Sequence, residues 1–197
     1  MIPLWLKLAY TVFAVVTVIA YARKYPAENF LWFSDIALLL TVAALWLESS
    51  LIASMMALAI LIPDVIWIVS FFGRLVSGRR ISGLTDYMFD PAKPRYLRAL
   101  SLFHVFLPVL LVWMIATLGY AATAFFAQTL LAWTVLLLTY RFADPRLNVN
   151  WVRRLGSLRT PGSPRVYLAF LMAGFPLMIY LPTHLVLMAL FGQTADA

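Results

Sequence analysis

The sequence predicts an all-α fold, a six-span transmembrane helical bundle that residues 1–197 form as one domain. Composition is the first reason: 64% of the residues are hydrophobic and 12% are charged, whereas soluble domains are roughly half apolar and about a quarter charged. The second reason is six apolar segments, each long enough to cross about 30 Å of hydrocarbon. The third is the concentration of basic residues in three of the connections. A bilayer is the expected environment, because a soluble fold would expose this apolar excess as one large patch.

The six expected spans lie near residues 4–22, 30–47, 50–73, 97–119, 121–140 and 166–191. Two of the apolar segments, 30–73 and 97–140, are almost unbroken, and one helix of that length would extend roughly 66 Å, about twice the hydrocarbon thickness. Each is therefore expected to fold as a helical hairpin. Residues 47–50 supply a polar turn for the first hairpin, and Gly119-Tyr120 supply the turn for the second.

The connection between the fifth and sixth spans contains a second kind of helical signal. Leu147, Trp151, Leu155 and Leu158 recur at helical spacing between two proline-containing turns. This pattern predicts a short amphipathic helix near 147–158 that lies at the membrane interface. We expect it to serve as an anchor on anionic lipid, in preference to a protein docking site.

Charge predicts the orientation of the bundle. Of the 15 basic residues, all but Lys7 follow the first, third and fifth spans: Arg23, Lys24, Arg74, Arg79, Arg80, Lys93, Arg95, Arg98, Arg141, Arg146, Arg153, Arg154, Arg159 and Arg165. The positive-inside rule places these loops in the cytoplasm and both termini on the periplasmic or extracellular side. The expected partners of the basic loops are anionic lipid headgroups, and no nucleic acid is expected.

A cleaved signal peptide is the main alternative for the first segment. Ala20-Tyr21-Ala22 resembles a signal-peptidase site that follows an apolar stretch. Cleavage there would leave five spans and would translocate all three basic loops. Because that outcome contradicts the charge pattern, the first segment is interpreted as a span.

Ionisable residues inside spans are costly and therefore indicate candidate functional positions. Counted from the cytoplasmic ends of their spans, Asp35 is roughly 8 Å deep, His104 about 10 Å and Asp64 about 13 Å. This shared depth on three helices predicts a polar pocket that opens to the cytoplasm. Its expected members are Asn29, Trp32, Ser34, Asp35, Asp64, Trp67, Ser101 and His104. The alternative is that these polar groups only join helices by hydrogen bonds.

Other sites and chemistries are limited by the residues present. A second polar site is expected near the outer side at Gln128, Thr183 and His184, where Pro176 and Pro182 should bend the last span. The chain has no cysteine, which excludes disulfides and thiolate chemistry. The two histidines lack the spacing of metal ligands, so we expect no metal and no cofactor. There is no glycine-rich phosphate loop either.

The two halves of the sequence echo one another faintly. Ile62-Pro63-Asp64 lies ten residues before a glycine, as does Pro182-Thr183-His184. Since each half would hold three spans, such repeats would be inverted, as in several transporter folds. A 3+3 inverted repeat is thus one interpretation of the similarity between the halves, and chance similarity between apolar segments is the other.

Three stretches carry a resemblance to a family. Residues 29–39, the loop 83–90 and residues 101–104 are similar to those of uncharacterised bacterial polytopic inner-membrane proteins. The resemblance extends over most of the chain. It implies a bacterial inner-membrane location, and it assigns no catalytic residue.

Three functions remain open at this stage. The first is a small-solute or proton-linked carrier or binding protein that uses Asp35, Asp64 and His104 and that forms a homo-oligomer. The second is a membrane-embedded enzyme for a lipid or prenyl-type substrate, with the same three residues as candidate acids and bases. The third is an assembly or structural subunit of a membrane complex. Whether the protein is an enzyme stays undecided by the sequence.

Overall fold

The computed structural model describes residues 1–154 and 163–192, and every regular element in them is helical. The helices are α1 (Leu4–Ala22), α2 (Phe33–Leu47), α3 (Ser50–Ser77), α4 (Arg95–Leu100), α5 (Phe103–Leu118), α6 (Ala124–Phe142), α7 (Pro164–Gly174) and α8 (Leu181–Phe191). A π-helical segment, η4 (Phe175–Tyr180), joins α7 to α8. Three short 3-10 turns are η1 (Ala27–Leu31), η2 (Asp86–Met88) and η3 (Val149–Trp151).

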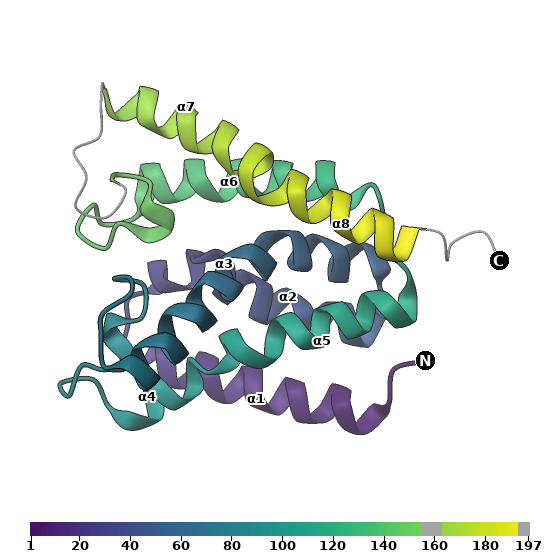
Figure 1. Ribbon diagram of the computed structural model, residues 1–197, viewed down its shortest axis with the longest axis horizontal. Helices are drawn as coiled ribbons and strands as arrows, with labels where there is room; N and C mark the ends of the chain where they lie inside the picture. The colour runs from purple at the N-terminus through teal and green to yellow at the C-terminus, as the bar shows by residue number, and fades with distance from the viewer. Residues whose placement is uncertain (155–162, 193–197) are drawn as a thin grey trace.

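The chain passes six times along the bundle, with α4–α5 and α7–η4–α8 each forming one pass (Figure 1). Five of the passes are long and apolar enough to cross a membrane, and α2, with 15 residues, is shorter. The prediction of an all-α six-pass bundle is therefore confirmed. The side surface carries many exposed large apolar side chains, for example Val12, Val109 and Leu130, as expected of a surface that faces lipid.

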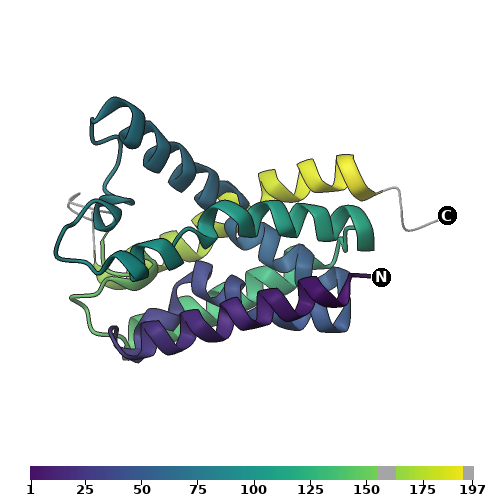
Figure 2. The same ribbon diagram turned by 90° about the horizontal axis from the view of Figure 1, so that it is seen from below.

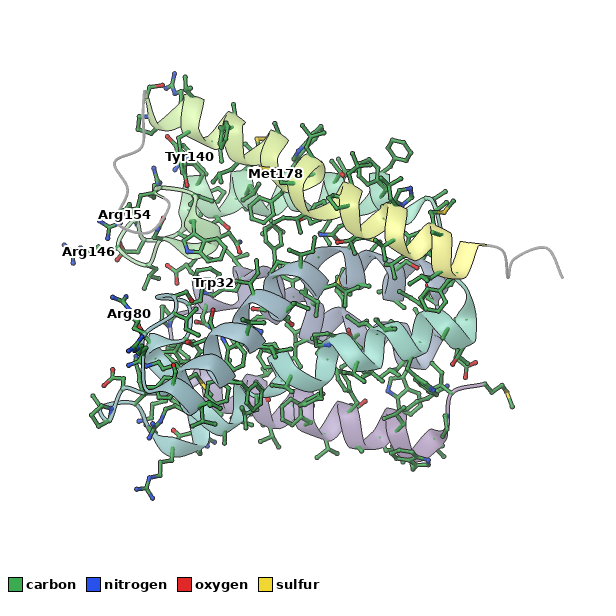
Figure 3. All side chains as sticks on the ribbon, in the orientation of Figure 1. Trp32, Arg80, Tyr140, Arg146, Arg154 and Met178 are labelled. Atoms are coloured by element: carbon green, nitrogen blue, oxygen red, sulfur yellow. The ribbon has the colours of Figure 1, made fainter. Side chains whose placement is uncertain are left out.

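The two ends of the bundle differ in charge. The start of α1 and the end of α8 lie at one end, called here the terminal end (Figure 1). The connections 23–32, 78–94 and 143–154 lie at the opposite end, called the basic end. Arg80, Arg146 and Arg154 project there, and Trp32 lies at the same end (Figure 3).

Helix α3 forms the centre of the molecule. Most of its first half is buried, with Ala53, Met56, Ala57 and Leu58 each 0% exposed. It packs against α2, α5 and α6 and also against η4 and α8. Small alanine side chains permit this close approach of several helices.

Proline residues bend two of the passes. Pro63 lies inside α3, where it removes one backbone hydrogen bond and favours a kink. The half of α3 beyond it leans away from the other helices toward the connection 78–94 (Figure 2). In the last pass, Pro176 and Pro182 flank the change from π-helical to α-helical structure.

Helix α2 begins at Phe33, whereas the sequence predicts a span from about residue 30. Residues 27–31 form a 3-10 turn instead. The side chain of Asn150, which comes from the connection after α6, accepts a hydrogen bond from the Phe33 N–H at 3.2 Å. It also donates to the Leu31 carbonyl at 2.7 Å. Asn150 therefore holds the start of α2 from outside the helix.

The amphipathic helix expected near 147–158 is absent from residues 147–154, and residues 155–158 lie outside the described part of the chain. Only the 3-10 turn Val149–Trp151 forms, and Asn148, Asn150 and Trp151 have φ values of 46°, 50° and 56°. The Asn148 side chain accepts hydrogen bonds from the backbone N–H groups of Arg153 and Arg154. Asparagine side chains thus take the place of helical hydrogen bonds here.

The two hairpin turns have local causes in the sequence. Glu48 ends α2 with φ 48°, and the Ser49 side chain accepts a hydrogen bond from the Ile52 N–H at the start of α3. Glu48 also forms an ion pair with Lys7 at 2.7 Å. At the second turn Gly119 has φ 84°, a value that glycine adopts without strain.

Candidate functional site

Asp64 and His104 form a hydrogen-bonded pair of ionisable side chains inside the bundle. Asp64 follows the Pro63 kink in α3, and His104 lies in the first turn of α5. The His104 Nδ1 and Asp64 Oδ1 atoms are 2.9 Å apart. Asp64 is 2% exposed, and its second oxygen, Oδ2, has no hydrogen-bond partner among the described residues. The pair therefore keeps one free carboxyl acceptor in the interior.

Aromatic rings hold the His104 side chain in place. The Trp67 ring stacks on the imidazole with a centroid distance of 4.9 Å. The Phe103 ring also stacks on the imidazole, with a centroid distance of 4.3 Å. Trp67 is one turn beyond Asp64 on α3, so one helix face supplies both the carboxyl and the ring. Stacking of this kind fixes the plane of the imidazole.

The second buried carboxyl belongs to Asp35, in the first turn of α2. Its Oδ2 accepts a hydrogen bond from the Asn29 amide at 2.9 Å, and the residue is 5% exposed. None of the ion pairs among the described residues involves Asp35. A carboxyl removed from water without a fixed cation is costly unless a proton or a cationic ligand balances it.

Three tyrosines that sequence analysis did not assign to the site lie near it: Tyr21, Tyr25 and Tyr87. The Tyr21 hydroxyl lies 2.8 Å from the Ser101 hydroxyl, and the Trp67 Nε1 donates to the Tyr87 hydroxyl at 3.2 Å. The rings of Tyr21 and Tyr25 pack edge to face at 5.4 Å. Asp35 is close enough for its charge to act on the phenol groups of Tyr21, Tyr25 and Tyr87.

The electrostatics of the two tyrosines in the connections agree with this arrangement. Burial raises the pKa of Tyr87 to about 12; hydrogen bonds with Ser101 and Trp67 act in the opposite direction, and the Asp35 charge adds to the rise. The pKa of Tyr25 is also raised, by burial first and by the charge of Asp35 second. Both phenols thus remain neutral hydroxyl groups at ordinary pH.

The structure joins most of the predicted pocket residues but not all of them. Two contact groups form: one contains Asn29 and Asp35, and the other contains Asp64, Trp67 and His104, with Ser101 reached through Tyr87. Trp32 lies apart from both groups, because its ring packs edge to face on Trp151 at 5.6 Å. Ser34 is half-buried and makes none of the hydrogen bonds described above. Trp32 and Ser34 therefore have no contact that assigns them to this cluster.

The acidic loop beside the site has a structural partner of its own. Asp86 accepts hydrogen bonds from Arg74 at 2.7 Å and from Arg80, and Arg74 also lies over the Phe89 ring at 4.3 Å. These contacts fasten η2, and with it Tyr87, to the end of α3. Asp86 is thus ion-paired with two arginines of this loop and of the end of α3.

The expected outer polar site is divided into separate contacts. His184 Nδ1 lies 2.7 Å from the Tyr120 hydroxyl, while the Gln128 amide donates to the Tyr180 hydroxyl at 3.4 Å. Thr183 donates to the Ile179 carbonyl one turn earlier in the same helix. Gln128, Thr183 and His184 therefore each have a different partner, and no hydrogen bond joins any two of them.

The arrangement at the basic end can hold a proton or a positively charged group. Within residues 1–154 and 163–192, no group of three or more His, Asp or Glu side chains gathers as metal ligands would. An imidazole paired with a carboxylate, together with a second buried carboxyl, is suited to proton exchange.

The fold and this cluster define a class, a multi-pass helical membrane protein with buried ionisable groups near one end. Comparison of the chain with protein-family models, with curated proteins and with solved structures found no match.

Proposed function

We propose that this protein is a small-solute carrier or binding protein of a bacterial cytoplasmic membrane, and that proton exchange at the Asp64–His104 pair is linked to its binding. One observation carries the proposal: two carboxyl groups, those of Asp35 and Asp64, are buried and neither is paired with a lysine or arginine. The distribution of basic residues supports a cytoplasmic position for the basic end, and hence outer positions for both termini.

A purely structural role for these residues explains less. Hydrogen bonds between helices need only a matched donor and acceptor, and uncharged Ser, Thr or Asn side chains provide them. Asp64 instead keeps a buried oxygen without a partner, and Asp35 satisfies one oxygen with the neutral Asn29 amide. Costly groups that are incompletely paired are typical of binding and proton-transfer sites.

Acid–base catalysis is the second candidate function. The 2.9 Å contact between His104 and Asp64 is the arrangement in which a carboxylate orients a histidine that acts as a general base. A lipid or prenyl-type substrate would have to reach His104 from the membrane side. A changed lipid composition in cells that carry the His104→Ala variant would favour this candidate.

The test is native mass spectrometry of the protein extracted gently from its own membrane, followed by identification of the small molecules released. We expect a stoichiometric solute with the wild type and with Asp144→Asn, a matched acid-to-amide change at an exposed loop residue. We expect its loss in the Asp35→Asn Asp64→Asn variant. A ligand-free particle with a co-purifying subunit would contradict the proposal and would favour a structural role.

A further inference from the structure

A groove with a volume of about 690 Å³ lies between α1 and α5 on the side surface of the bundle. Both helices pack on α2. Tyr10 forms part of the floor of the groove, because it is buried and its hydroxyl donates to the Leu38 carbonyl of α2 at 2.9 Å. Among the described residues, no charged side chain lines the groove. It therefore suits an apolar occupant, since a polar group placed there would lose its hydration.

We propose that this groove holds one acyl chain of a phospholipid, from the bilayer leaflet at the terminal end. The inference goes beyond the proposed function, because it concerns the outer wall of the bundle and a ligand other than the solute. A cavity of about 150 Å³ accepts a benzene ring. The groove is several times larger and so has room for a hydrocarbon chain.

The groove extends over the depth of one leaflet. A rise of 1.5 Å per residue along α1 places Leu6 about 3 Å and Phe13 about 14 Å beyond Leu4, and one leaflet contributes about half of the roughly 30 Å of hydrocarbon. At the depth of Phe13 its ring meets the Phe106 ring edge to face, with 5.1 Å between the centroids. The groove thus begins near the membrane surface and ends near the midplane, as an acyl chain does.

A helix from a second copy of the chain fits this groove less well. A transmembrane helix crosses the whole hydrocarbon layer and is about 10 Å across with its side chains. The contact between Phe13 and Phe106 would block such a helix at mid-depth. An acyl chain ends at that depth, so the length of the groove favours lipid over a second protein chain.

The hydrocarbon chain, rather than the headgroup, is the part that the groove recognises. On the α5 side, Val109 and Trp113 line the groove and are 69% and 40% exposed, so both offer apolar surface to a chain. Lys7, next to Leu6 in the sequence, is paired with Glu48 at 2.7 Å, and its charge is therefore already balanced. We expect lipids with neutral and with anionic headgroups to bind alike.

The first experiment is native mass spectrometry of the full-length protein, stripped of lipid in detergent and then titrated with dioleoylphosphatidylethanolamine. The wild type should retain one lipid more tightly than any further lipids. Ala9→Phe places a ring in the groove and should weaken this retention several-fold. Ala189→Phe, the same change at an exposed alanine of α8, should leave retention unchanged. Dioleoylphosphatidylglycerol should give the same pattern.

The second experiment needs no substitution. The wild type is reconstituted in vesicles with a phosphatidylethanolamine that carries a photoreactive diazirine in its acyl chain, and the labelled peptides are identified. Labelling should be several-fold denser in residues 6–13 and 105–113 than on α6, where Leu130 and Leu137 are also exposed. Lipid that merely surrounds the protein would label all the exposed helices alike.

Three results would overturn the inference. They are undiminished lipid retention by Ala9→Phe, even labelling of the exposed helices, and retention of phosphatidylglycerol without phosphatidylethanolamine. The last result would place the bound lipid at the arginines of the basic end instead. Neither experiment involves the Asp64–His104 pair, so the proposed function stands or fails separately.

Discussion

The indole ring of Trp67 lies against the imidazole ring of His104, with 4.9 Å between the centroids and 26° between the planes. Its nitrogen at the same time donates to the Tyr87 hydroxyl. Trp67 therefore touches both halves of the cluster, the Asp64–His104 pair in the helices and the tyrosines near Asp35. A substitution among the tyrosines should therefore affect the Asp64–His104 pair, and a substitution in the pair should affect the tyrosines.

The contact between Trp67 and Tyr87 gives a first prediction. Trp67→Phe and Tyr87→Phe each remove the same hydrogen bond but keep an aromatic ring. In a double-mutant cycle we expect a coupling energy of about 0.5–1.5 kcal/mol, because the second change has no hydrogen bond left to remove. Reversible unfolding in mixed micelles provides the measurement, and additive effects of the two changes would contradict the contact.

Asn150 gives a second prediction, because it holds the start of α2 through two hydrogen bonds. Asn150→Ala should lower the free energy of unfolding by about 1–3 kcal/mol for the unpaired backbone groups. A further 1 kcal/mol or so should come from alanine at a positive φ.

Asn150→Gly separates the two causes. Glycine loses the same side-chain hydrogen bonds but adopts φ 50° without strain. Its effect on the free energy of unfolding should therefore be smaller than that of alanine. Equal stability of Asn150→Ala and the wild type would show that the connection after α6 does not hold α2.

The Lys7–Glu48 pair gives a prediction of pH dependence at the terminal end. The hydrogen bond from Lys7 is the main reason that the pKa of Glu48 lies below its ordinary value of 4.5. A lowered pKa in the folded state means that the pair stabilises the protein above pH 4.5, and that this stabilisation is lost as the pH falls through the lowered value.

The matched variant is Glu48→Gln. It should melt at a lower temperature than the wild type at neutral pH, and the difference in melting temperature should shrink as the pH falls below 4.5. High salt should also reduce the difference, because Glu48 is partly exposed. A difference that is the same at acid and neutral pH would show that the charge of Glu48 contributes nothing.

Orientation in the membrane gives a fourth prediction. Because the chain has no cysteine, single cysteines can be introduced without a background of labelling. Ala92 lies in the connection 78–94 at the basic end, and Ala122 lies in the turn before α6 at the terminal end; both are exposed. In intact cells, an impermeant maleimide should label Ala122→Cys but reach Ala92→Cys only after the cells are opened. Labelling in the reverse order would invert the topology.

The helices were predictable because their signal is simple: long apolar segments, interrupted by Glu48-Ser49 and Gly119 where turns are required. The neighbourhood of Asp64 and His104 was also accessible, since depth in a helix follows from the residue number. The exact ends of the spans were harder to predict. Whether residues 30–32 join α2 depends on Asn150, more than a hundred positions later, and periodicity carries no such information.

The tyrosine half of the cluster was beyond sequence reasoning for a related reason. Tyr25 and Tyr87 lie in connections, and their positions depend on contacts such as those of Asp86 with Arg74 and Arg80. Helical spacing predicted that Trp32 lines the pocket, but its ring packs against Trp151 instead. The prediction of an interfacial helix was wrong over 147–154. Asparagine side chains form hydrogen bonds with the local backbone there in place of helical hydrogen bonds, and the leucine spacing does not reveal this.

The most direct test of the account is difference infrared spectroscopy of the carboxyl groups in reconstituted membranes as the pH is changed. If Asp64 and His104 exchange protons with water, the wild type should show a reversible carboxyl band that is missing in Asp64→Asn and shifted in His104→Gln, while Asp144→Asn keeps it. A spectrum in which no buried carboxyl responds to pH, or in which Asp64→Asn is identical to the wild type, would contradict proton-linked binding and leave these residues a structural role.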